Sequence, residues 1–316
     1  MQVSVIVITY EPDINKLIAT LKSIVHQKNI SYEIIVSDDG SKRVNIDNVE
    51  STVYEVVPEG IPIRFIKNLE NRGTVLNIYS ACQYVSGEYI KVISPGDLLY
   101  DDVVLSNFYA YAKRNSQHSF FFGRPAYYSN DGSLEIYEVS TPLYPEIFNS
   151  KSQRIHNLAL IHGHGPVGAS YFHKAEDYKK YIGLVANHVK FTEDYTTSFL
   201  YLLDNGKLSF LDRKVVWYEY GLGISTGNTD KWKKIYEDDC KELYKIAKRE
   251  YEDNIYLEFR FGNKKKRFFH PILVLSILWI NRISKKRTVH IKHTKEQIDY
   301  LKSILKTDIS EDNTKL

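Results

Sequence analysis

Three short acidic segments contain the residue types that could do chemistry. They are Asp38-Asp39, at the start of an Asp-Asp-Gly-Ser turn, Asp97, at the end of Ser-Pro-Gly-Asp, and Glu193-Asp194, just before an apolar helical pattern. A carboxylate can accept hydrogen bonds from a base N–H or a ribose hydroxyl, hold a hard cation, or remove a proton from a hydroxyl. The same residues also suit ordinary turns and helix N-termini, so their types alone leave both interpretations open.

Strand and helix patterns place the first two acidic segments at strand ends. Continuous β-branched or apolar runs predict strands at 3–9, 32–36, 63–66 and 88–93, and apolar residues at helical spacing predict helices at 13–27 and from the loop 68–73 to about residue 85. Strands that alternate with helices form a largely parallel sheet with helices on its faces. In such a sheet the ligand crevice lies at the carboxyl edge, where Asp38, Asp39 and Asp97 fall.

The rest of the chain continues the mixed pattern. We expect strands at 120–122, 135–139 and 215–218, and helices at 177–182, 195–205 and 231–251. The predicted organisation is a catalytic domain at 1–227, with a nucleotide-binding half (1–105) and an acceptor-binding half (106–227), followed by a helical region at 228–316.

The order of motifs in the first part of the chain resembles one enzyme family. The run from Val3 to Tyr10 followed by Glu11-Pro12, the helix ending Ser-Ile-Val-His-Gln, and the segment 32–41 (YEIIVSDDGS) resemble the nucleotide-binding half of family 2 glycosyltransferases. The resemblance covers about the first 105 residues well and continues more weakly to about residue 227. It implies the A-type glycosyltransferase fold, a Rossmann-like, mostly parallel sheet flanked by helices. The implied activity is inverting transfer of a sugar from a nucleotide sugar, with UDP as the expected nucleotide.

The first donor contacts follow from the strand ends. Thr9, Tyr10 and Glu11 supply a backbone edge and a ring on which a flat base could rest. The resemblance assigns Asp39 to the base and places Asp38 near the ribose or in support of the turn. It also makes Arg72 a contact to the base or to phosphate, since a planar guanidinium suits either partner. A surface salt bridge is the alternative role for this arginine.

The diphosphate is expected near Ser94 and Asp97. Family members typically have an Asp-x-Asp element here that binds Mn²⁺ or Mg²⁺, whereas this chain has Ser94 and Gly96 in place of the pair. Asp97 remains as the expected metal ligand, because Mg²⁺ keeps several waters and needs few protein ligands. The incomplete pair leaves metal dependence open. A second glycine-containing segment places Ser225 and Thr226 where they could donate hydrogen bonds to phosphate.

The resemblance gives Asp194 the role of catalytic base. Displacement at an anomeric carbon needs a base on the face opposite the leaving diphosphate, and a carboxylate within hydrogen-bond reach of the acceptor hydroxyl suffices. Glu193 and His164 are expected on the acceptor side. A metal role for His164 and its neighbour His162 is not favoured, because two histidines at this spacing lack a third ligand.

Charge and composition narrow the location and the partners. The net charge is +3, but the tail from Lys264 contains 13 Lys/Arg against 5 Asp/Glu. Within it, basic residues flank the apolar run 268–280, so the segment 264–287 is expected to dock on an anionic membrane surface. An ordinary core helix is the alternative. The run is too short to span a bilayer.

Two isolated cysteines and the lack of a secretion signal indicate a cytoplasmic protein at the inner face of the membrane. We expect a nucleotide-sugar donor and a lipid-linked or oligosaccharide acceptor as partners, and no nucleic acid. The sequence does not decide between a monomer and a homo-oligomer.

Two other functions compete with this one. The first is a non-catalytic sugar-nucleotide-binding scaffold, motivated by the missing Asp-x-Asp pair. The second is a nucleotidyltransferase, although the Gly-rich, basic phosphate loop typical of that class is replaced by Thr9-Tyr10-Glu11-Pro12.

Overall fold

Strands and helices alternate through the first hundred residues, as predicted. The computed structural model describes residues 1–131, 133–137, 145–161, 165–221, 230–251, 254–261 and 292–306, with a few positions between 271 and 282. The first elements are β1 (Val3–Thr9), α1 (Ile14–Val25), β2 (Tyr32–Asp38), α2 (Ile46–Val56), β3 (Ile63–Lys67), α3 (Thr74–Cys82) and β4 (Tyr89–Ile93). The four strands and the helices α1 and α3 confirm the prediction.

Among these first elements, helix α2 is the one that the sequence pattern did not predict. It contains several β-branched residues, which lower helix propensity, and only Val49 and Val53 are buried. The side chain of Asn45 caps its first turn by accepting hydrogen bonds from two backbone N–H groups. A short apolar stripe and a good cap therefore form a helix that periodicity alone does not reveal.

The later elements complete a nine-stranded sheet. Its remaining strands are β5 (Leu98–Leu99), β6 (Phe120–Ser129), β7 (Glu135–Tyr137), β8 (Tyr171–Lys174) and β9 (Leu208–Glu219). The strand order is β3-β2-β1-β4-β8-β6-β9-β5, with β7 paired to β6. Pairing is parallel from β3 to β4 and between β6 and β9, whereas β8, β5 and β7 pair antiparallel with their neighbours. The sheet is thus mixed, with a parallel first half.

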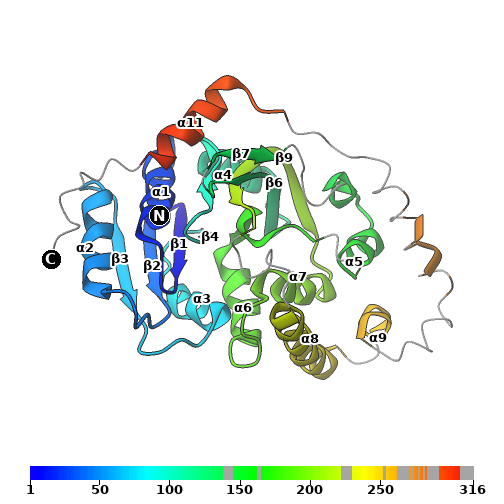
Figure 1. Cartoon of the computed structure of the whole chain (residues 1–316). Helices are drawn as coiled ribbons and strands as arrows, with labels where there is room; N and C mark the ends of the chain where they lie inside the picture. Colours follow the sequence, from blue (N-terminus) through cyan, green and yellow to red (C-terminus); the bar gives the residue numbers. More distant parts are fainter. Residues whose placement is uncertain are drawn as a thin grey trace.

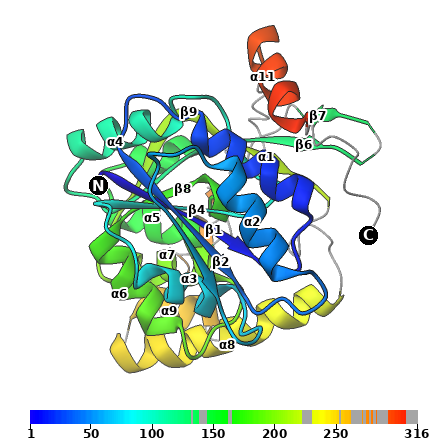
Figure 2. The ribbon, with the colours of Figure 1, turned by 90° about the vertical axis from the view of Figure 1, so that its left-hand side faces the viewer.

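Helices cover both faces of this sheet (Figures 1 and 2). One core cluster joins the sheet to α1, α2, α4 (Val104–Arg114) and α11 (Lys295–Leu305). The other joins it to α3, α5 (Gln153–Ile161), α6 (Ala175–Val185), α7 (Glu193–Leu203), α8 (Asp230–Glu250) and α9 (Ile255–Phe261). The short 3-10 helices are η1 (Pro145–Asn149) and η2 (Gly168–Ser170). Along β1, Val5 belongs to one cluster and Ile6 to the other, as expected for a strand buried on both faces.

Strand register brings the predicted motifs to one edge. Thr9 pairs with Asp38 at the carboxyl ends of β1 and β2, and Val7 pairs with Ile93 near the end of β4. The loops that follow these three strands therefore emerge side by side, as the parallel-sheet argument requires.

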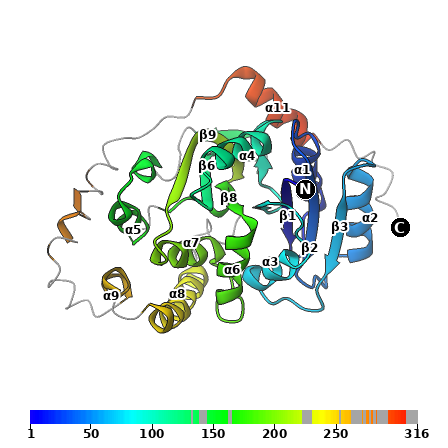
Figure 3. The same cartoon turned by 180° about the vertical axis from the view of Figure 1, so that it is seen from behind.

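Helices from the C-terminal region pack against both sides of the sheet. Helix α8 contacts α6 and α7, and α11 contacts α1, an arrangement visible from front and back (Figures 1 and 3). Among the helices that the structure describes, none is long and apolar enough to cross a membrane. Most of the predicted docking segment 264–287 lies outside the described residues.

Candidate active site

A cavity of about 670 Å³ opens at the carboxyl edge of the sheet. Its walls come from the segments after β1 and β4, from the end of β9, from η2 and the loop before it, from the N-terminus of α7 and from α8. Of the predicted site residues, those that line it are Tyr10, Glu11, Ser94, Asp97, Glu193 and Asp194. The fold thus brings segments almost two hundred residues apart in sequence to one cavity.

The segment after β1 provides one wall. Tyr10 is 48% exposed and presents a ring to the cavity. The Glu11 carboxylate accepts hydrogen bonds from the backbone N–H groups of residues 42–44 at 2.8–3.1 Å. The first of these bonds, from Lys42, is the main cause that lowers the pKa of Glu11. Glu11 therefore remains ionised and fixes the neighbouring loop.

The predicted base-binding residues form a connected group next to the cavity. The buried Asp38 carboxylate accepts hydrogen bonds from the Thr9 hydroxyl (3.1 Å) and from the Ser41 hydroxyl (2.6 Å). The Asp39 carboxylate accepts the backbone N–H groups of Arg72 (3.0 Å) and Gly73 (2.8 Å). Burial is the main cause that raises the pKa of Asp39.

Because of these bonds, four of the predicted donor-binding residues lie outside the cavity lining. Among the described residues that line the cavity, Thr9, Asp38, Asp39 and Arg72 are absent. The Arg72 guanidinium instead donates to Ser80 on α3 at 3.2 Å. The predicted site residues therefore do not all line the cavity: the loops at 39 and 72 bind each other beside it, where the Asp39 side chain stabilises the turn.

Gly40 shows why this turn is so tight. Its φ is +71°, and an added Cβ would lie 2.4 Å from the backbone of Glu70. Only glycine permits such an approach between the loops after β2 and β3. The Asp-Asp-Gly-Ser sequence thus serves as a structural turn, whatever it contacts in a donor.

Asp97 lies where the sequence predicts it, at the floor of the cavity. Its Oδ1 accepts the backbone N–H of Glu219 at 3.3 Å. Burial raises the pKa of Asp97 to about 7. The nearby Lys91 is fully buried, and burial lowers the pKa of its ammonium to about 7. Neither group has a strong preference for its charged form at neutral pH.

The donor set at Asp97 does not fit a dedicated cation site. Hard divalent cations are held by several oxygen ligands, and the carboxylate of Glu219, whose backbone N–H donates to Asp97, is paired with the Lys16 ammonium at 2.6 Å. In the parts of the chain that the structure describes, no group of three or more His, Cys, Asp or Glu side chains could hold a metal ion. Lys16 and Glu219 both line the cavity and were not predicted from the sequence.

Two adjacent carboxylates stand at the N-terminus of α7. Glu193 and Asp194 both line the cavity, and Asp194 Oδ1 accepts the backbone N–H of Tyr195 at 2.7 Å. Burial raises the pKa of both groups, and for Glu193 the charge of Asp194 raises it further. Gly168 packs closely, since an added Cβ would be 3.2 Å from Asp194 Oδ2. The pair can therefore bind a proton at a pH above the ordinary range of carboxyl pKa values.

A buried carboxylate from α8 fixes the loop that leads to this pair. Asp239 is 4% exposed and accepts the backbone N–H groups of Lys190, Phe191 and Thr192, each at 3.0 Å. It also accepts the Thr192 hydroxyl at 3.1 Å. Sequence reasoning missed Asp239, because it is one acid among many on a polar helix and its partners lie nearly fifty residues away.

Three predicted site residues cannot be placed. His164, Ser225 and Thr226 lie outside the described residues, as does His162. Their expected roles toward the acceptor and the diphosphate stay predictions.

Comparisons with known proteins agree with this architecture. The family model described as Glycosyl transferase family 2 matches residues 4–176. A comparison with curated proteins finds no match. The S. aureus TarS 1-349 structure in complex with UDP-GlcNAc is similar with a TM-score of 0.51 at 15% identity, covering 84% of this chain and 78% of that one. The structure of S. aureus TarS 1-349 gives 0.50 at 15% identity, covering 88% and 79%.

The likeness to these structures concerns the fold. In a longer S. aureus TarS chain, with a TM-score of 0.48 and 15% identity, the match covers 84% of this chain but only 46% of that one. The family model, in contrast, spans more than half of the present chain, including β1, the turn after β2, the Asp97 loop and η2. With this match and an α/β architecture that agrees with it, the chain belongs to glycosyl transferase family 2.

Proposed function

We propose that this enzyme is an inverting glycosyltransferase that moves a sugar from a UDP-sugar to a hydroxyl of a lipid-linked or polysaccharide acceptor in cell-surface glycan synthesis. The observation that supports it most is the shared cavity, which is lined by Tyr10 and Asp97 from the first half of the chain and by Asp194 from the second half. Uracil is proposed because a structure of similar fold, S. aureus TarS 1-349, is in complex with UDP-GlcNAc. Asp39 and Arg72, beside the cavity, remain the proposed base contacts.

The proposed reaction is a single displacement. The Asp194 carboxylate takes the proton of the acceptor hydroxyl, whose oxygen forms a bond to the anomeric carbon of the donor sugar. The bond between that carbon and the phosphate oxygen breaks, and UDP leaves with the electron pair. Attack opposite the leaving group inverts the configuration. Glu193 is proposed to face the acceptor.

A donor screen tests the nucleotide assignment. A ligand that binds only the folded state stabilises it by about 2.7 kcal/mol at a hundredfold excess over its Kd. We expect UDP and UDP-sugars to raise the melting temperature by several degrees, and GDP, CMP and dTDP to have little effect. Thermal unfolding with each nucleotide measures this. A larger shift with GDP than with UDP would refute the uracil assignment.

The raised pKa of the carboxylate pair predicts the pH dependence. The base must be deprotonated, so kcat/KM should fall as the pH drops through the apparent pKa of the pair, which burial places above the ordinary carboxyl value of about 4. The charge of Asp194 raises the pKa of Glu193 further, so Glu193 keeps its proton while Asp194 titrates, and Glu193→Gln should leave the acid limb in place. Initial rates at saturating donor and varied acceptor concentration, across pH 4–9, measure the acid limb in both enzymes. An acid limb that moves to lower pH in Glu193→Gln would contradict this order of titration.

Membrane docking by the C-terminal segment also stays a proposal. Leu275, Leu278 and Trp279 are 64%, 58% and 58% exposed, and their spacing places them on one helical face. Insertion of such a face between anionic lipid headgroups would bring the enzyme close to a lipid-linked acceptor. Co-sedimentation with phosphatidylglycerol vesicles should be lost in a variant with all three replaced by serine.

A further inference from the structure

The space beside Gly96 is filled by a carboxylate from a distant strand. An added Cβ at Gly96 would lie 2.4 Å from Oε2 of Glu219, at the end of β9. The backbone N–H of Glu219 also donates to Asp97, so the strand end and the loop are joined at two points. A side chain at position 96 and the present placement of Glu219 are mutually exclusive. Glycine at this position thus allows Glu219 to stand where a residue-96 side chain would project.

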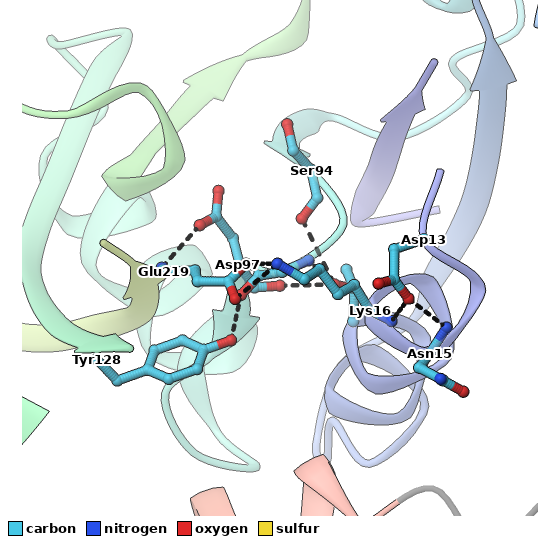
Figure 4. Close-up of polar contacts among 9 residues, drawn as sticks. Asp13, Asn15, Lys16, Ser94, Asp97, Tyr128 and Glu219 are labelled. Carbon is cyan, nitrogen blue, oxygen red and sulfur yellow. Dashed lines mark hydrogen bonds and ion pairs between the residues drawn. The ribbon is translucent and has the colours of Figure 1, made fainter. Parts of the chain in front are cut away.

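Lys16 is bound to this carboxylate in a fixed position. Its Nζ lies 2.7 Å from Oε1 and 2.6 Å from Oε2 of Glu219, and Figure 4 shows the two side chains pointing toward each other beside Asp97. One turn along α1, Thr20 accepts the Gly96 N–H (3.1 Å) and donates to the Asp97 carbonyl (2.9 Å). The helix, the loop and the strand end therefore hold the ammonium as one unit.

The ammonium is also the main source of positive charge for a bound anion. Among the described residues that line the cavity, Lys16 is the sole Lys, Arg or His. Its side chain remains 30% exposed, and an ammonium has three N–H donors, more than a bidentate pair with one carboxylate consumes. Of its acidic neighbours, Glu11 accepts backbone N–H groups of the loop after β2, and Asp13 accepts the N–H of Asn15 at the start of α1. A diphosphate in this cavity would meet Lys16 as its cation.

We propose that the Lys16 ammonium, held by Glu219 beside Gly96, binds the diphosphate of the donor and takes the place of a divalent cation. This inference rests on the proposed function. In this arrangement a carboxylate, Glu219, still holds a cation against the diphosphate. The cation is the ammonium of Lys16 and not a metal ion. As the sugar–phosphate bond breaks, negative charge grows on the leaving diphosphate, and a fixed cation stabilises that charge.

The test compares UDP and uridine, which differ in the diphosphate alone. A hydrogen bond to a charged group contributes about 1.5–3 kcal/mol, so Lys16→Met should weaken UDP binding about 10- to 100-fold and leave uridine binding unchanged. UDP affinity of the wild type should change by less than about twofold between excess EDTA and millimolar Mn²⁺, on the premise that no metal is needed. Calorimetry and ligand-observed NMR give the affinities.

Two variants separate the role of the ammonium from loss of folding. Lys28→Met removes an ammonium of similar pairing, 2.7 Å from Asp102 and outside the cavity lining, and should bind UDP like the wild type. In the double variant Lys16→Met/Glu219→Gln, the Glu219 charge that Lys16→Met would leave unpaired is also removed. Its affinity for UDP should be as low as that of Lys16→Met. Wild-type affinity for UDP in either Lys16→Met variant would overturn the proposal, as would UDP binding that EDTA abolishes and Mn²⁺ restores.

Failure of the lysine role and failure of the proposed function give different results. A wild type that binds UDP and uridine, with both affinities unchanged in Lys16→Met, refutes the role of the lysine alone. A wild type that binds neither ligand refutes both. Equal loss of UDP and uridine binding in Lys16→Met would also overturn the proposal, since the effect would not depend on the diphosphate.

Discussion

Asp194→Asn should lower sugar transfer by about 10²- to 10⁴-fold, the range that a general base contributes, while UDP affinity stays unchanged. The carboxylate lines the cavity, and burial raises its pKa, so it is suited to accept the proton of an acceptor hydroxyl. Asparagine has nearly the same shape but cannot take that proton. Asparagine keeps a side-chain oxygen that can accept the Tyr195 N–H, so the substitution should not destabilise the fold. Single-turnover rates and UDP titrations measure the two effects separately.

A matched control has an aspartate in the same local setting but away from the cavity. Asp47 lies in the first turn of α2, as Asp194 does in α7, and pairs with Lys67 at the surface. Asp47→Asn should therefore transfer sugar at the wild-type rate. Full activity of Asp194→Asn would place the base elsewhere. A wild type that binds UDP-sugars but neither transfers nor hydrolyses them would instead favour the scaffold alternative.

The parts of the fold that were predictable are those set by local pattern. The β-branched run of β1 and the apolar spacing of α1 have no good alternative to a buried strand and an amphipathic helix, and both were predicted. Parallel strands then bring their carboxyl ends together, which is why Tyr10 and Asp97 meet at one cavity. Asp194 reaches the same cavity from the N-terminus of α7, which the strand argument does not predict. Helix α2, with its short buried stripe, shows the limit of that reasoning.

The site itself depends on pairings that local pattern does not encode. Lys16 and Glu219 are 203 positions apart, and nothing near either residue indicates that they meet. Local sequence pattern also does not indicate the direction in which side chains point at a turn. Asp39 was expected to face a base, yet its oxygens accept backbone N–H groups of the 72–73 loop. Residue types at a strand end thus predict which groups are available, while tertiary contacts decide which remain free for a ligand.

Asp239→Ala should produce the largest loss of stability. The substitution leaves the buried N–H and hydroxyl of Thr192, and the partly buried N–H groups of Lys190 and Phe191, without their acceptor. An unsatisfied buried donor costs about 1–3 kcal/mol, so even with partial rescue by water the free energy of unfolding should fall by about 3 kcal/mol. Urea unfolding monitored by tryptophan fluorescence measures it. The adjacent Asp238→Ala removes only a surface pair with Lys241 and should change stability by about 0.5 kcal/mol or less.

Asp239→Ala should also slow sugar transfer. Asp239 holds the loop that ends at Thr192 and so sets where Glu193 and Asp194 begin α7. Loss of that anchor leaves the base present but poorly aligned, which lowers kcat more than it raises the KM for the donor. Asp239→Asn keeps one carbonyl acceptor and should lie between the two extremes. If Asp239→Ala unfolds in urea like Asp238→Ala and retains the wild-type kcat, the clamp has no role in placing the base. A chain cut after residue 227 lacks this carboxylate, and we expect it to show the same misalignment.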